Sequence, residues 1–118
     1  MSLILTVDDD PQSLFLMRVL LEQGGHTVHE ASDGAEAVER ASKQRYDLVL
    51  MDLQMPGMDG LEAARRIRAE ANTPRIVLLT TEAMANTVDV TTSACDDYLI
   101  KPIDLQNFCA QINSYLDA

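Results

Sequence analysis

The sequence predicts an α/β fold, a doubly wound parallel sheet of five strands with helices covering both faces. Two observations predict it. Short runs rich in Val, Ile and Leu alternate along the chain with longer segments of helical periodicity. The strongest runs are apolar throughout, which is typical of strands buried on both faces. With 118 residues, 47% of them hydrophobic, the chain is expected to form a single domain, residues 1–118.

Short apolar runs mark the predicted strands. The strong runs lie at Leu3–Val7, Val49–Met51 and Ile76–Leu79, and weaker ones lie at Thr27–Ala31 and Tyr98–Ile100. Because parallel strands need a crossover connection, the intervals between the runs are expected to hold helices. The predicted order is therefore strand and helix repeated five times, (βα)₅.

Capping signals bound the first two helices. Asp10 is predicted to be an N-cap, with the first helix beginning at Pro11 and stopping at Gly24–Gly25. The segment 33–36, with sequence DGAE, resembles a capping box and opens a second helix that runs to about Gln44.

The later helices are predicted from similar signals. The segment 59–62, DGLE, opens a third helix that runs to about Ala71. The fourth crossover, Met84–Ser93, is expected to hold a weak helix because it is rich in β-branched residues. Asp104 is predicted to cap the last helix. The apolar stripe of that helix is expected to consist of Leu105, Phe108, Cys109, Ile112 and Leu116.

The composition narrows the possible partners and the compartment. The formal net charge is -10 and the pI is about 4.3, so the chain should repel nucleic acid and anionic membrane surfaces. Insertion into a membrane is not expected. It should instead attract cations and basic protein surfaces. No apolar run approaches the roughly 20 residues of a membrane span, and the two cysteines lack metal-ligand spacing. A cytoplasmic location is expected.

Polar side chains follow four of the predicted strands. They are Asp8, Asp9 and Asp10 after the first strand, Asp52 after the third, Thr80 and Thr81 after the fourth, and Lys101 after the fifth. Taken singly, each has an ordinary explanation as a cap, a turn residue or a solvated side chain, and Asp10 is assigned to capping. Ligands of doubly wound sheets bind outside the carboxyl ends of the strands. We therefore expect the other side chains to meet in one crevice.

This combination predicts a metal-dependent phosphoryl site. Clustered carboxylates need a counter-charge, and a hard divalent cation supplies one. Mg²⁺, with Mn²⁺ as an alternative, prefers carboxylate, carbonyl and water oxygens. Asp52 is then placed to act as a nucleophile toward phosphorus. The metal and Lys101 would neutralise the oxygens of the transferred group, and the hydroxyl of Thr80 could donate to one of them.

Four segments together resemble the receiver domain of two-component response regulators, a flavodoxin-like (βα)₅ fold. They read VDDDP, LVLMDLQMPGMDG, LLTTEA and DDYLIKP, and the resemblance extends from Leu3 to about Leu116. It implies that Asp52 is the phosphoacceptor in a phosphorelay. The donor would be a phosphohistidine on a histidine kinase or a histidine phosphotransfer domain. The domain would be a signalling module that catalyses only its own phosphorylation and dephosphorylation, either free or as the cytoplasmic part of a larger hybrid kinase or regulator.

The resemblance also implies a role for each residue of the site. The metal ligands would be Asp9 directly, Asp8 largely through metal-bound water, Asp52, and the backbone carbonyl of Gln54. The phosphoryl group would be bound by Lys101, Thr80 and Thr81, with a cis peptide bond before Pro102. Thr80 and Tyr98 would form a switch pair. The pair would alter the face made by Met84–Ser93, the fifth strand and the last helix, where an output domain or target protein binds.

Two other functions are compatible with parts of the sequence. In a haloacid-dehalogenase-type phosphatase, Asp8 would be the nucleophile and Asp10 the acid and base of a D-x-D motif. That alternative lacks the threonine expected shortly afterwards and leaves the segment MDLQMPGMDG unexplained. The second alternative is a receiver-like module that binds a partner without being phosphorylated. Phosphorylation assays on Asp52→Asn and Asp8→Asn separate the three functions.

Overall fold

The structure, a computed structural model, describes residues 2–53, 60–69, 74–81, 95–101 and 103–117. Five parallel strands form one sheet in the order β2-β1-β3-β4-β5. The strands are β1 (Leu3–Val7), β2 (Thr27–Ala31), β3 (Leu48–Asp52), β4 (Arg75–Thr80) and β5 (Asp97–Ile100). The helices are α1 (Pro11–Gln23), α2 (Gly34–Lys43), α3 (Gly60–Arg68) and α5 (Phe108–Asp117). The predicted fourth helix, Met84–Ser93, lies outside the described residues.

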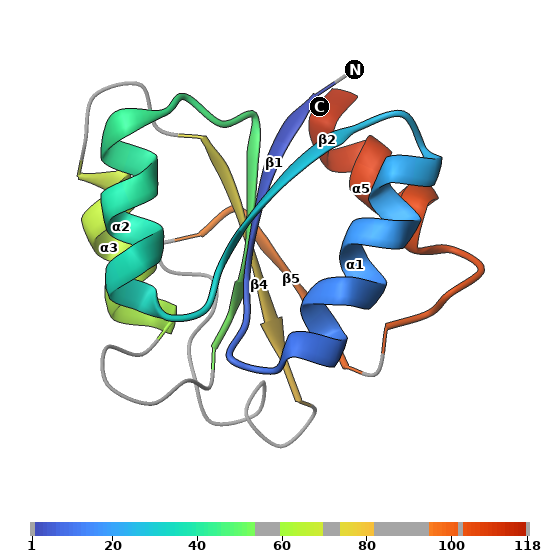
Figure 1. Ribbon diagram of the computed structural model, residues 1–118, viewed down its shortest axis with the longest axis horizontal. Coiled ribbons are helices and arrows are strands. Elements are labelled where there is room, and N and C mark those ends of the chain that lie inside the picture. The colour runs from blue at the N-terminus through green and yellow to red at the C-terminus, as the bar shows by residue number, and fades with distance from the viewer. Residues whose placement is uncertain (1, 54–59, 70–73, 82–94, 102, 118) are drawn as a thin grey trace.

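The predicted doubly wound fold is confirmed. Figure 1 shows α2 and α3 on one side of the sheet and α1 and α5 on the other. The predicted bounds of β1 and β2 agree with the structure, whereas β3 and β4 each extend one residue beyond the predicted apolar runs at both ends, so that Asp52 and Thr80 are the last residues of their strands. Among the described helices, none is long and apolar enough to cross a bilayer.

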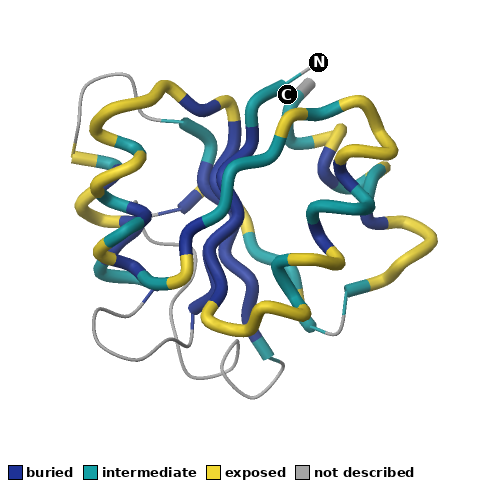
Figure 2. The backbone as a smooth tube through the Cα atoms, viewed as in Figure 1, coloured by how far each residue is buried: buried dark blue, intermediate teal, exposed yellow. Residues whose placement is uncertain are grey.

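The sheet separates two hydrophobic cores, which explains why its strands are apolar throughout. In β3, Val49 and Met51 face the core under α2 and α3, whereas Leu48 and Leu50 face the core under α1 and α5. All four side chains are fully buried. Figure 2 shows the buried residues concentrated in the central strands and the exposed residues on the outer surfaces of the helices. The side chain at the end of β3, Asp52, is therefore carried by a strand that is held from both sides.

The caps of α1 and α2 form largely as predicted. The carboxylate of Asp10 accepts a hydrogen bond from the backbone N–H of Gln12. At α2, the Asp33 carboxylate accepts from the backbone N–H of Glu36 at 2.7 Å. The Glu36 carboxylate reaches back to the backbone N–H of Ser32 at 2.8 Å, one residue before the cap. The capping box is therefore reciprocal but extended by one residue.

Two predictions about helix ends were wrong. The last helix begins at Phe108 rather than next to Asp104, because residues 105–107 form a turn that precedes it. Asp104 closes that turn, since its carboxylate accepts from the backbone N–H of Gln106. Leu105 consequently lies outside the apolar stripe and is 58% exposed. Helix α3 ends at Arg68, earlier than the predicted end near Ala71; the predicted cap at Asp59 lies outside the described residues.

Strand β1 is the point at which the chain reverses its direction across the sheet. It pairs with β2 on one side and with β3 on the other. The connections that leave β1 and β3 therefore run to opposite faces, and a crevice opens between the carboxyl ends of these two strands. Asp8 follows β1 and Asp52 ends β3, so both border this crevice.

The first prediction concerns the capping box of α2. Hydrogen bonds from Ser32, backbone first, lower the pKa of Glu36 below its ordinary value, and nearby Arg40 contributes. The ionised carboxylate therefore stabilises the folded state above the unfolded pKa of about 4.5, and this contribution is lost as the pH falls through the folded pKa. We expect Glu36→Gln to lower the free energy of unfolding at pH 7 by a few tenths of a kcal/mol. In urea titrations, the difference from wild type should shrink as the pH falls below about 4.5. A difference that grows on acidification would contradict this explanation.

Candidate functional site

Asp8 is the most deeply buried carboxylate of the site. Its side chain is 1% exposed and lies directly after β1. One carboxylate oxygen accepts a hydrogen bond from the backbone N–H of Asp10 at 3.0 Å. The other is 3.0 Å from the ammonium nitrogen of Lys101. A buried carboxylate requires such partners, because an unpaired charge in the protein interior is strongly disfavoured.

Asp52 shares the same lysine. Its carboxylate lies 3.3 Å from Lys101 Nζ and is 9% exposed. The backbone that carries it is fixed beyond the strand end, where Leu53 donates to the carbonyl of Leu79 at 2.8 Å. The Leu53 carbonyl in turn accepts from the N–H of Gly60 at 3.2 Å. Asp52 is thus held between β4 and the first residue of α3.

Lys101 supplies the only positive charge at this cluster among the described residues. Its backbone N–H donates to the Thr80 carbonyl at 2.7 Å, continuing the β4–β5 pairing. Burial alone would lower the pKa of Lys101, but the hydrogen bond to Asp8 and the charges of Asp52 and Asp8 outweigh burial and raise that pKa above its ordinary value. The ammonium group therefore stays charged throughout the physiological pH range.

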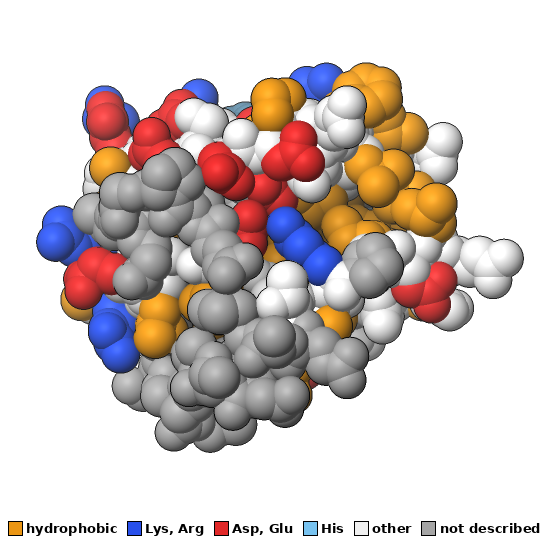
Figure 3. Space-filling view, turned by 90° about the horizontal axis from the view of Figure 1, so that it is seen from below, with side chains coloured by type: hydrophobic (Ala, Val, Ile, Leu, Met, Phe, Trp, Pro, Cys, Tyr) orange, Lys and Arg blue, Asp and Glu red, His pale blue; other side chains and the backbone are white. Residues whose placement is uncertain are grey.

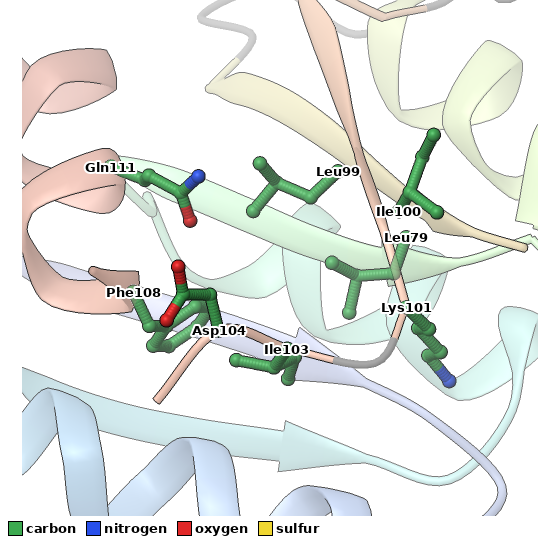
Figure 4. A pocket seen from close by; sticks show the side chains of 8 residues that line it. All are labelled: Leu79, Leu99, Ile100, Lys101, Ile103, Asp104, Phe108 and Gln111. Carbon is green, nitrogen blue, oxygen red and sulfur yellow. The ribbon is translucent and has the colours of Figure 1, made fainter. Parts of the chain in front are cut away.

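The stem of Lys101 borders a cavity of about 230 Å³ between β5 and α5. Five apolar side chains line most of it, with Asp104 and Gln111 at the side of α5. Figure 4 shows that the Lys101 amine points away from this cavity. The lysine is therefore directed by the carboxylates of Asp8 and Asp52 and not by the cavity beside its stem.

The carboxylates of Asp8, Asp9 and Asp52 form a cluster that fits a hard cation. Each offers an oxygen, and the three oxygens lie within 4.8 Å of one another. One ammonium opposes three carboxylates, so the described groups carry an excess negative charge. Mg²⁺ favours a few carboxylates together with water, and the exposed position of Asp9 leaves one side of the cluster open to solvent. Figure 3 shows acidic side chains around a basic side chain on this face.

The structure brings together only some of the other predicted residues. Thr80 is buried at the end of β4, and its hydroxyl donates to the Thr81 carbonyl at 3.3 Å. Tyr98 lies on the neighbouring strand β5 and is partly buried. Gln54 and Pro102 lie outside the described residues, so the predicted carbonyl ligand and the predicted cis peptide bond stay predictions.

Sequence reasoning missed two features of the site. It predicted Lys101 as a partner of the phosphoryl group but not its contact with Asp8, which lies 93 positions away in the chain. It also gave no role to Gly60, whose backbone touches the residues that carry Asp52. The first follows from strand order, which periodicity does not reveal. The close approach of Gly60 could have been suspected because the DGLE segment has a glycine at its second position, which the capping-box pattern does not require.

The family model for the response regulator receiver domain matches residues 4–113. The chain therefore belongs to the response regulator receiver domain family, as the sequence motifs predicted. It is a signalling domain of the two-component type.

Curated relatives of the chain are transcriptional regulatory proteins. ResD of Bacillus subtilis (strain 168) is 37% identical over 113 residues, which cover 96% of this chain and 47% of ResD. SrrA of Staphylococcus aureus (strain NCTC 8325) is 35% identical over the same share of each chain. The chain thus spans about half the length of the curated relatives it matches.

Solved structures share the fold over nearly the whole chain. The receiver domain of the sensor histidine kinase PA1611 from Pseudomonas aeruginosa PAO1, with a magnesium ion coordinated in its active-site cleft, has a TM-score of 0.90 and 31% identity, covering 99% of this chain and 98% of that one. The response regulator TrrA from Thermotoga maritima, in complex with Mg²⁺-BeF, has a TM-score of 0.86 and 32% identity, covering 98% and 99%.

The second prediction tests the ion pairs of Lys101. We expect Lys101→Met to lower the free energy of unfolding without Mg²⁺ by about 3 kcal/mol, because two buried carboxylates lose their counter-charge. Mg²⁺ should recover part of this loss, since the cation can replace the ammonium charge. The measurement is urea unfolding followed by circular dichroism, with and without Mg²⁺.

The matched control is Lys43→Met. Lys43 pairs with Glu39 on the surface of α2 at 2.9 Å, with both side chains largely exposed. Such pairs contribute about 0.3–0.5 kcal/mol, so this variant should remain close to wild type at any Mg²⁺ concentration. Equal losses in the two variants would show that the Lys101 ion pairs do not hold the site together.

Proposed function

We propose that this domain accepts a phosphoryl group on Asp52 in a reaction that requires a divalent cation, Mg²⁺ or Mn²⁺. One observation carries the proposal: the Asp52 carboxylate ends a rigid central strand and shares the Lys101 ammonium with Asp8 in a cluster of three carboxylates. Such a carboxylate is held in place beside a positive charge. The geometry suits a nucleophile that must stay ionised until an anionic group arrives.

The chain's own residues would divide the chemistry among them. An Asp52 oxygen forms the new bond to phosphorus while the bond from phosphorus to the donor breaks, and the leaving group takes the electron pair. Lys101 stabilises the negative charge of the transferred oxygens, and Thr80 and Thr81 donate hydrogen bonds to them. A cation held by Asp9, Asp52, the Gln54 carbonyl and, through water, Asp8 would supply further charge neutralisation. The same groups would serve hydrolysis of the aspartyl phosphate.

The two alternative functions receive less support. In the phosphatase alternative Asp10 must act as an acid and base, yet its carboxylate accepts hydrogen bonds from Gln12 and Ser13 at the start of α1. A receiver-like module without phosphorylation would not need the buried arrangement of Asp8, Asp52 and Lys101. In a module that is not phosphorylated, the desolvation penalty of these buried charges would lower stability without serving a function.

A protein donor of the phosphoryl group fits the surface beside the site. Phe15 and Leu16 of α1 and Leu105 of the loop before α5 are exposed apolar side chains. Leu16, Lys101 and Ile103 line a shallow hollow of about 420 Å³, and Figure 3 shows hydrophobic side chains beside the charged cluster. Exposed apolar patches commonly mark interaction sites. We therefore propose that a histidine kinase or histidine phosphotransfer domain binds here while its phosphohistidine reaches Asp52.

The output surface is proposed to include β5 and to be separate from the donor surface on α1. Thr80, Tyr98 and Ile100 project from the same face of β4 and β5, because side chains of a strand alternate between faces. If Thr80 leaves Thr81 to donate to the phosphoryl group, Tyr98 gains room to turn inward. The face of Met84–Ser93, β5 and α5 would then bind an output domain or target protein.

The wider setting is also a proposal. Residues 1–118 are proposed to form one receiver domain that acts in the cytoplasm and contacts no nucleic acid itself. Because the curated relatives are transcriptional regulators about twice as long, an output domain or separate target would carry the response.

The third prediction tests the phosphoacceptor. Incubation with acetyl phosphate and Mg²⁺ should add one phosphoryl group to the wild-type protein, detected by intact-protein mass spectrometry. Asp52→Asn should abolish the addition because the nucleophile is lost, and Asp8→Asn should shift the Mg²⁺ requirement to higher concentrations. Asp10→Asn is the control, since asparagine caps a helix about as well as aspartate, and it should be phosphorylated normally. A mass gain that persists in Asp52→Asn would sink the assignment.

The fourth prediction tests the output surface by amide hydrogen exchange. With Mg²⁺ and beryllofluoride, amides of Met84–Ser93 should gain protection, because the sequence of this segment has weak helix propensity and its order is expected to depend on contacts near Thr80 and Tyr98. Thr80→Ala should reduce the gain by removing the hydroxyl that responds to the ligand. Protection changes restricted to α1 would place the output surface elsewhere.

A further inference from the structure

The first residue of α3 packs directly on the backbone of Asp52. A Cβ atom added to Gly60 would overlap the carbonyl oxygen of Asp52 and would lie 2.8 Å from Leu53 Cα and 2.9 Å from the Asp52 carbonyl carbon. Cβ atoms in proteins essentially never come within 3.0 Å of such atoms. All three neighbours belong to the backbone, so rotation of a side chain cannot relieve the overlap.

The segment that Gly60 touches is fixed on its other side as well. Leu53 donates to the Leu79 carbonyl in β4 at 2.8 Å, and its own carbonyl accepts from Gly60 at 3.2 Å. Asp52 itself is paired with β4 in the sheet, opposite Leu79. A side chain at Gly60 must therefore move the Asp52–Leu53 backbone, move α3, or move both.

A movement of this backbone bears directly on the charged cluster. The Asp52 carboxylate carbon is two bonds from the Asp52 Cα, which is bonded directly to the affected carbonyl carbon, and the carboxylate lies 3.3 Å from Lys101 Nζ. Its oxygens also lie within 4.8 Å of those of Asp8 and Asp9. A misplacement of about 1 Å in a reacting group can reduce a rate on the order of a hundredfold. Contacts to Asp52 are therefore more consequential here than the same contacts elsewhere in the sheet.

We infer that Gly60 is a positioning residue for Asp52: the absence of a side chain at Gly60 sets the place of the Asp52 carboxylate relative to Lys101, Asp8 and Asp9. The inference rests on the proposed function where it concerns phosphorylation, whereas the geometry of the carboxylate cluster is independent of that function. Alanine has a higher helix propensity than glycine. A loss in Gly60→Ala would therefore have to come from the contact with Asp52 and Leu53.

The experiment compares Gly60→Ala with two control variants. Gly24→Ala adds the same methyl group where it meets only ordinary contacts, at 3.4–3.6 Å from its neighbours. Ile112→Val lowers stability in the core on the opposite side of the sheet, away from Asp52. For each protein the Mg²⁺ dissociation constant is measured by calorimetry. The phosphorylation rate is measured at saturating acetyl phosphate and Mg²⁺, and backbone amide shifts are recorded by NMR.

We expect Gly60→Ala to weaken Mg²⁺ binding at least fivefold and to slow phosphorylation at saturation at least tenfold. Its amide shifts should change at Asp52, Leu53 and Lys101. Both control variants should bind Mg²⁺ and react like wild type. Wild-type behaviour of Gly60→Ala, or losses equal to those of Ile112→Val, would overturn the inference.

Two further arms keep the outcome unambiguous. If Gly60→Ala is unfolded at 25 °C, the measurements are repeated with trimethylamine N-oxide, which favours the folded state of every variant. Recovery of the fold without recovery of Mg²⁺ affinity supports the inference, and recovery of both overturns it. If wild type itself is not phosphorylated, the proposed function fails, while Mg²⁺ affinity and the amide shifts still decide the role of Gly60.

Discussion

The arrangement of this molecule depends on one ammonium group shared by two buried carboxylates. Lys101 lies 3.0 Å from Asp8 and 3.3 Å from Asp52, and these three residues follow or end three different strands of the sheet. The contact therefore ties β5 to β1 and β3 across the crevice where the chain reverses direction. One positive charge opposes two buried negative charges and the nearby Asp9, so the described groups of the site carry an excess of negative charge. A divalent cation would neutralise this excess.

The same imbalance explains how a chemical event at Asp52 could be felt elsewhere. A phosphoryl group on Asp52 would bring additional negative charge close to Lys101, so the lysine would be drawn toward it and away from Asp8. Thr80, whose hydroxyl now donates to Thr81, would gain a charged acceptor, and hydrogen bonds to charged acceptors are the stronger ones. Both responses start at the ends of β4 and β5, which is the edge of the sheet where the output surface is proposed. A small change of charge would thus bias two strands at once.

Sequence patterns predicted the sheet well because burial on both faces leaves a simple signal, a run such as LVLM with no polar interruption. They predicted the cap of α1 because Asp10 and Pro11 act locally. They failed where tertiary contacts decide: the turn after Asp104 delays α5 to Phe108 and exposes Leu105. The Asp8–Lys101 contact and the closeness of Gly60 to Asp52 also depend on which elements become neighbours in space. Neither periodicity nor composition contains that information; the convergence of the strand ends placed Lys101 at the site but did not reveal its contact with Asp8.

The three consecutive aspartates after β1 are tolerated because each has a different environment. Asp8 turns into the crevice and is neutralised by Lys101. Asp9 is exposed, so solvent screens its charge, yet one of its oxygens still reaches the carboxylate cluster. Asp10 turns to the start of α1, where hydrogen bonds from Gln12 and Ser13 and the positive end of the helix dipole stabilise its charge. The backbone N–H of Asp10 also donates to Asp8, so the cap that begins the helix orients the buried carboxylate as well. Repulsion among the three charges is therefore relieved in three separate ways, and Asp9 faces the open side of the cluster, where a cation can approach.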